Sequence, residues 1–157
     1  MKKKWIPAAG IIVLILTIVY VFVWKERHKE ILGAAEFQKM CKKEGIELVD
    51  AKDNVPFANI QKAYLSPNQS PSVEYYKFKN TQSGKILSDF YISEVNQKYK
   101  KDKPTKTQKL DKTRGSYALK TSKNAVFVQH INDIVVVICC DAKDINKAET
   151  LINKIYK

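Results

Sequence analysis

The chain has 157 residues, 45% of them hydrophobic, and a formal net charge of +12 from 28 lysine or arginine and 16 aspartate or glutamate residues. This length suits one domain with a single core and is too short for two ordinary domains. Only two basic residues are arginine, Arg27 and Arg114. Proteins that read nucleic acid favour arginine for its bidentate fork, so the composition argues against a nucleic-acid partner.

The N-terminus has the pattern of a membrane anchor. A basic head, Met1–Lys4, precedes an uncharged, largely apolar stretch from Trp5 to Trp24. A helix of about 20 residues spans about 30 Å, the thickness of the hydrocarbon core of a bilayer. We therefore expect residues 1–24 to form a head and a single transmembrane helix, and residues 25–157 to form one domain. The basic head favours an N-terminus inside the cell and an extracytoplasmic C-terminal domain.

Two other interpretations of this segment stay open. A cleaved signal peptide would need small residues after its apolar region, whereas bulky residues, Val21–Trp24, stand there. A type IV pilin-like subunit would be cut at a glycine before the apolar run, and Gly10 resembles that site. The pilin pattern, however, has a glutamate where this chain has Ile15.

The next segments alternate between helical and extended patterns. Apolar residues at helical spacing predict a helix over Lys29–Lys43, continuing from the anchor with a break near Gly33. Alternation predicts a short strand over residues 46–50. Residues 57–65 are ambiguous and suggest a helical turn, and the loop composition of residues 66–72 precedes a strand over residues 73–78.

A second helix is predicted to begin at Thr81 or Ser83. Its apolar residues form one stripe that we expect to face the core: Ile86, Leu87, Phe90, Tyr91, Val95 and Tyr99.

Residues 98–114 are the most biased part of the chain. Apart from Leu110 they hold almost no core-forming residue, and we expect a long polar connection. The segment is also the candidate contact for an anionic surface, such as acidic headgroups or wall polymers. Its basic residues are Lys98, Lys100, Lys101, Lys103, Lys106, Lys109, Lys112 and Arg114.

The C-terminal third predicts three antiparallel strands, residues 116–121, 125–131 and 134–140, followed by a helix that begins at Asp141 or Asp144. Asn132 and Asp133 suit a two-residue hairpin turn. The continuous apolar run from Ile134 predicts a central strand covered on both faces. Helices and strands without a regular βαβ repeat indicate an α+β fold, an antiparallel sheet packed with helices.

No residue pattern points to a catalytic, metal or cofactor site. Three cysteines, Cys41, Cys139 and Cys140, are a poor disulfide framework. Cys139 and Cys140 are neighbours on a predicted strand and point to opposite faces, and the favoured interpretation is that one of them is a buried free thiol. A bridge from Cys41 to either of the others is the alternative. His28 and His130 are expected to be ordinary interface and surface-strand residues.

The layout of anchor and domain resembles the small single-pass membrane-anchored extracytoplasmic α+β proteins of unknown function from Gram-positive bacteria. This resemblance implies a location and no activity. The leading hypothesis is a membrane-tethered, non-catalytic interaction module that binds a protein partner or an anionic envelope surface. The alternatives are a thiol-dependent enzyme or redox protein, or a pilin-like subunit.

Overall fold

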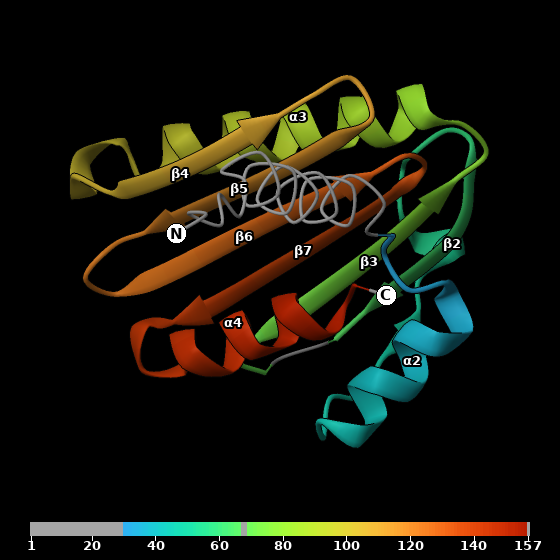
Figure 1. Cartoon of the computed structure of the whole chain (residues 1–157), viewed down its shortest axis with the longest axis horizontal. Coiled ribbons are helices and arrows are strands. Elements are labelled where there is room, and N and C mark those ends of the chain that lie inside the picture. Colours follow the sequence, from blue (N-terminus) through green and yellow to red (C-terminus); the bar gives the residue numbers. More distant parts are fainter. Residues whose placement is uncertain (1–29, 67–68, 157) are drawn as a thin grey trace, which may run out of the picture. The chain divides into compact units, whose positions relative to one another are not determined.

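The computed structural model describes residues 30–66 and 69–156. Within these ranges seven strands form one antiparallel sheet with three α-helices packed on it, which confirms the α+β class (Figure 1). The chain from Ile31 onwards forms one compact unit. The expected head and anchor, residues 1–24, lie outside the described residues, and none of the described helices is long and apolar enough to cross a membrane.

The sheet has the strand order β1-β2-β3-β7-β6-β5-β4, so that β1 and β4 form its two edges. Its strands are β1 Val49–Asp50, β2 Ile60–Leu65, β3 Ser72–Phe78, β4 Thr105–Leu110, β5 Arg114–Lys120, β6 Asn124–Ile131 and β7 Ile134–Asp141. The apolar strand β7 lies in the middle, between β3 and β6, and Val135, Val136, Val137 and Ile138 are fully buried. The predicted central position of this strand is therefore confirmed.

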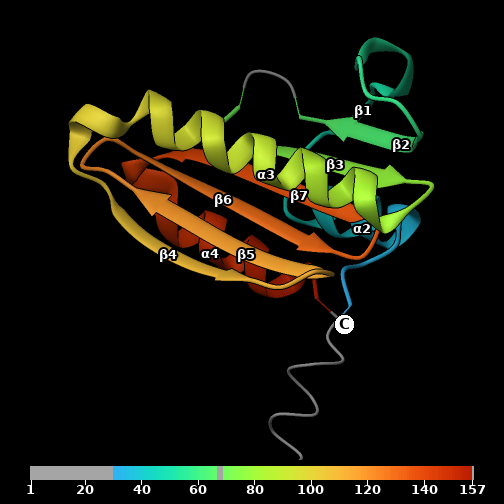
Figure 2. The same cartoon turned by 90° about the horizontal axis from the view of Figure 1, so that it is seen from above.

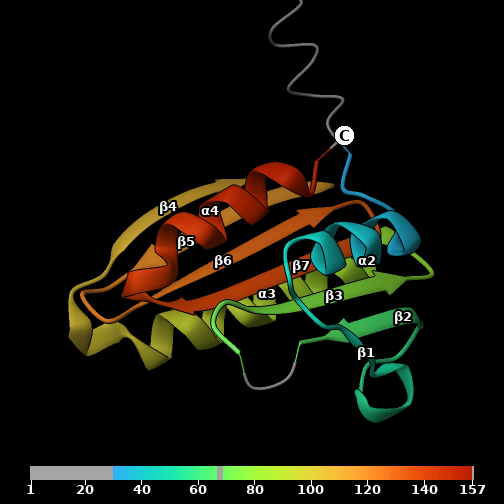
Figure 3. The ribbon, with the colours of Figure 1, turned by 90° about the horizontal axis from the view of Figure 1, so that it is seen from below.

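Helices cover both faces of the sheet. Helix α3, Thr81–Lys98, packs on one face, mainly over β6 and β7 (Figure 2). Helices α2, Ala34–Lys43, and α4, Ile145–Lys154, pack on the opposite face (Figure 3). Each face has its own apolar core, because successive residues of a strand point to opposite sides of the sheet.

Helix α3 begins where the sequence predicts, but its buried face differs from the predicted stripe. The side chain of Asn80 caps the helix and accepts a hydrogen bond from the Ser83 N–H. Leu87 and Val95 are buried as expected. Ile86 and Phe90 are instead 62% and 53% exposed, because the small residues of this helix, not these two, face the sheet at its N-terminal end.

The first predicted helix is shorter than expected. It begins only at Ala34, because the residues before it pair with the C-terminus. Ile31 forms a bridge with Tyr156, and the Leu32 N–H donates to the Ile155 carbonyl at 2.8 Å. The strand predicted at residues 46–50 is likewise reduced to β1.

Two strands were not predicted. Residues 57–65, for which the sequence suggested a helical turn, contain strand β2. Residues 98–114, expected to be a polar connection without structure, contain a 3-10 turn at Lys100–Asp102 and strand β4. All six residues of β4 are exposed, and the strand is defined by its pairing with β5, from Thr105 opposite Lys120 to Leu110 opposite Gly115.

Candidate functional site

The eight basic residues singled out in the sequence lie along one edge of the sheet, which we call the basic edge. Lys98 ends α3, Lys100 and Lys101 lie in the 3-10 turn, Lys103 follows it, Lys106 and Lys109 lie on β4, Lys112 lies in the β4–β5 turn and Arg114 begins β5. The seven lysines are exposed and Arg114 is half-buried. The segment that was expected to be a connection without structure therefore forms the basic edge through a 3-10 turn and strand β4.

The side chains of the basic edge point to both sides of the sheet. Lys106 lies opposite Leu119, which is part of the core under α3, so Lys106 points to the α3 side. Lys109 is an odd number of residues away and points to the α4 side. Six residues of strand extend about 20 Å. The basic edge is therefore a ridge along the sheet, with lysine side chains on both the α3 side and the α4 side.

The lysines of this ridge are not neutralised by neighbouring carboxylates. Within the described ranges the recorded ion pairs join Lys85 to Asp89, Lys120 to Glu149 and Lys154 to Glu44. None of the seven lysines of the basic edge forms an ion pair with a described residue. Their charges are available to an external anion.

The backbone of β4 also faces outward. The Asp111 N–H donates to the Arg114 carbonyl at 2.7 Å, so these two residues form a hydrogen-bonded pair. Such pairs alternate along an antiparallel ladder, which places the N–H and C=O groups of Lys106, Gln108 and Leu110 on the open side of the sheet. Lysines on an open edge keep other strands from pairing with it. This purely structural role is compatible with anion binding.

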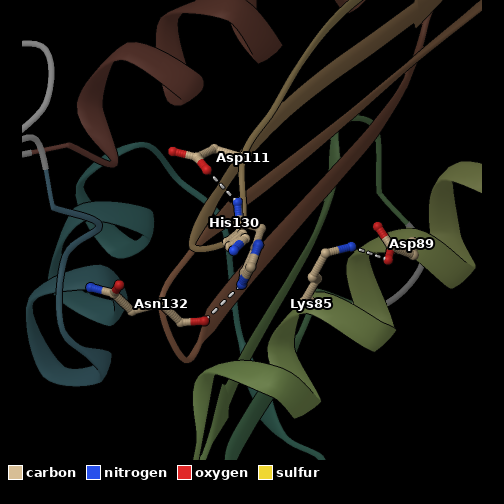
Figure 4. A network of polar contacts seen from close by, with 6 residues as sticks. Lys85, Asp89, Asp111, His130 and Asn132 are labelled. Atoms are coloured by element: carbon tan, nitrogen blue, oxygen red, sulfur yellow. Dashed lines mark hydrogen bonds and ion pairs between the residues drawn. The ribbon is translucent and has the colours of Figure 1, made fainter.

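At one end the basic edge leads into a cleft of about 260 Å³ between α3 and the β4–β5 turn. The lining residues are Lys85, Ser88, Asp89, Leu110, Asp111, Lys112, Arg114 and His130. Figure 4 shows His130 between Asp111 on one side and Lys85 on the other, with Lys85 paired to Asp89. The sequence offered no reason to group these residues, since α3 and β6 are far apart along the chain.

His130 is buried, not on the surface as the sequence suggested, and only 2% of it is exposed. Its Nε2 lies 2.7 Å from the Asn132 carbonyl oxygen. A carbonyl only accepts, so Nε2 carries the proton in the neutral ring. Burial lowers the pKa of His130 below its ordinary value, and the hydrogen bond to Asn132 and the carboxylate of Asp89 only partly oppose this. His130 is therefore a neutral imidazole at pH 7.

The three cysteines are free thiols, so the expected alternative of a bridge from Cys41 to the sheet is wrong. Of the two neighbouring cysteines, Cys140 is buried and Cys139 is half-buried, as the favoured interpretation predicted, and Cys41 is buried as well. Burial raises the pKa of Cys41 to about 12 and that of Cys139 to about 11, and it also raises the pKa of Cys140. Because the thiolate is the nucleophile, these environments disfavour thiol chemistry.

In the part of the chain that the structure describes, no three histidine, cysteine, aspartate or glutamate side chains are grouped to share a metal ion. No family model, curated protein or solved structure matches the chain. The class that the fold defines is a small α+β domain with a seven-stranded antiparallel sheet.

Proposed function

We propose that this protein is a membrane-tethered, non-catalytic module that binds a phosphate-bearing anionic surface of the cell envelope through the basic edge. The observation that carries the proposal is the row of exposed lysines on and around β4, none of which forms an ion pair within the described part of the chain. The tether is the apolar segment from Trp5 to Trp24, argued from its length and lack of charge. The domain is then extracytoplasmic, as the basic head favours.

The electrostatics support binding by the edge as a unit. A basic residue near an anionic membrane contributes about 1 kcal/mol, and the effect fades within a Debye length of about 8–10 Å. A ridge with cations on both flanks can bring several of its lysines within that distance of one surface. A single exposed ion pair contributes only about 0–1 kcal/mol, which is too little for stable binding. Several lysines that reach the same surface add their contributions.

Phosphate is the chemistry shared by two sources near a tethered domain, lipid headgroups and anionic wall polymers. Co-sedimentation of the full-length protein in nanodiscs of neutral lipid, with phosphatidylglycerol vesicles in one arm and purified wall polymer in the other, distinguishes the two. The informative variant combines Lys100→Gln, Lys106→Gln and Lys109→Gln, three exposed residues outside the His130 cleft.

The matched control combines Lys52→Gln, Lys62→Gln and Lys79→Gln. These lysines are equally exposed and lie away from the basic edge, and the change in net charge is identical. We expect the edge variant to lose most of the binding in at least one arm and the control variant to keep most of it. Equal binding by the two variants in both arms would contradict the proposal.

A further inference from the structure

His130 is held in one orientation by the close approach of three segments. Its Nε2 is fixed by the Asn132 carbonyl, as described above. A Cβ atom at Gly84 of α3 would lie 3.0 Å from that carbonyl oxygen and 3.3 Å from Nε2. On the other side, a Cβ at Gly115 of β5 would lie 3.8 Å from the His130 Cβ and 3.0 Å from the Leu110 side chain. The two glycines thus make the space that the ring occupies.

The second ring nitrogen, Nδ1, has no hydrogen-bond partner in residues 30–66 and 69–156. The Asn132 contact is the one hydrogen bond that His130 makes with its side chain among the described residues. Every fully buried side-chain nitrogen or oxygen in these ranges has a hydrogen-bond partner. Because Nδ1 has none, it is not fully buried, and the accessible space beside it is the cleft that His130 lines. Ser88 is also 2% exposed, lines the same cleft and has a hydroxyl without a partner among the described residues.

Several charged groups line the cleft or lie near the His130 ring. Helix α3 contributes Lys85 and Asp89, the β4–β5 turn contributes Asp111 and Lys112, β5 contributes Arg114, and Asp133 of the β6–β7 turn lies near enough to affect the ring. Lys85 is paired with Asp89, and Asp111 accepts from the Lys112 backbone N–H. The Lys112 ammonium makes no ion pair with a described residue and is free to meet an anion.

We propose that this cleft binds one phosphodiester group, with His130 taking up a proton from solvent at Nδ1 and donating it as a hydrogen bond to a phosphate oxygen. The uptake balances as imidazole plus one proton giving imidazolium, with no bond of the phosphodiester broken. Ser88 donates to a second oxygen, and Lys112 supplies a further positive charge. A tetrahedral phosphate has acceptor oxygens pointing in several directions, which suits donors on α3, β6 and the β4–β5 turn.

The inference deepens the proposed function and rests on it for the source of the phosphate. The cleft and the middle of the basic edge use different residues, so each can fail without the other. Binding of a phosphodiester in the cleft would select phosphate within the anionic surface that the ridge attracts.

The coupling to a proton gives the inference a specific signature. Burial keeps the free His130 neutral, and a bound anion stabilises the charged ring, so the pKa of His130 is higher in the complex than in the free protein. Between these two pKa values, affinity falls about tenfold for each unit that the pH rises, because one proton is bound with each anion. Above the higher value, affinity no longer depends on this group.

The probe is dimethyl phosphate, whose single charge is constant across this pH range. Full-length protein in uncharged detergent, labelled at its histidines, is titrated with pH by NMR in dimethyl phosphate and in sodium chloride of the same ionic strength. The chain has two histidines, and His28→Gln assigns the signals of the other. We expect dimethyl phosphate, and not chloride, to raise the pKa of His130.

The variants His130→Gln and Lys112→Gln separate the proton-dependent role of His130 from the contribution of the Lys112 charge. In His130→Gln the terminal amide can still donate to the Asn132 carbonyl but no Nδ1 is present, so binding weakens and loses its pH dependence. Lys112→Gln weakens binding by up to about fivefold, the range for an exposed ion pair, whereas Lys52→Gln does not. If His130→Gln fails to fold, the wild-type titration together with Lys112→Gln decides.

Identical titration of His130 in dimethyl phosphate and in chloride would overturn the inference, whatever the outcome for the basic edge. Repeating the titration with phosphatidylglycerol in the micelles, or with a soluble glycerol phosphate polymer, identifies which source reaches the cleft.

Discussion

At the scale of single residues, burial decides the chemistry of the polar side chains. His130 could not be recognised as buried from the sequence, because the glycines that enclose it, Gly84 and Gly115, are remote from it along the chain. The cysteines were easier to anticipate, since free cysteine is often buried, although the half-exposed position of Cys139 follows only from the sheet.

The thiols give the first prediction. With pKa values of about 12 for Cys41 and about 11 for Cys139, both thiols are protonated at pH 8, and the raised pKa of Cys140 acts in the same direction. We expect a disulfide reagent to modify the folded protein slowly and to modify all three thiols rapidly after denaturation. A thiol that reacts in the folded state as fast as in the denatured state would restore the redox hypothesis.

A second prediction concerns Glu74, which accepts hydrogen bonds from the hydroxyls of Tyr76, at 2.8 Å, and Tyr91. Hydrogen bonds to a charged group contribute about 1.5–3 kcal/mol. Tyr91→Phe should therefore lower the free energy of unfolding by about that amount in urea denaturation. Tyr99→Phe is the control, because its hydroxyl has no partner among the described residues. Equal stability of the two variants would show that the Glu74 contact contributes nothing.

At the scale of elements, apolar strands were predictable and polar ones were not. Strands β5, β6 and β7 were predicted within one or two residues, because their residues are apolar where a core covers them. Strand β4 is covered on neither face, so its sequence alternates in no way that identifies a strand. Its existence depends on the partner β5. The basic residues named from the sequence therefore lie on a turn and an edge strand, and not on the polar connection without structure that was expected.

The alternation of hydrogen bonds along β4 gives a third prediction. The Thr107 N–H faces β5, opposite Ala118, whereas the Gln108 N–H faces outward. Thr107→Pro removes a ladder hydrogen bond and should destabilise the domain by at least about 1 kcal/mol. Gln108→Pro should cost less, since it removes no such bond. Thermal unfolding of the two variants measures the difference, and the reverse order would contradict this register.

At the scale of the whole molecule, a run of exposed lysines lies along one edge of the sheet, and the buried apolar side chains of the described residues form a core on each face. Composition predicted the excess of positive charge but not its position, which depends on β4 being an edge strand. Because the lysines of the basic edge are exposed, any binding through them must weaken with salt, as ions screen exposed charges over a Debye length.

The most direct measurement is the salt dependence of binding to phosphatidylglycerol vesicles and to wall polymer, for the wild-type protein and the two triple variants described above. We predict that wild type and the Lys52, Lys62 and Lys79 variant bind tightly at low salt and are released steeply as salt rises. The Lys100, Lys106 and Lys109 variant should bind weakly with a shallow dependence. If all three proteins show the same salt curve on both surfaces, the basic edge is not the binding site.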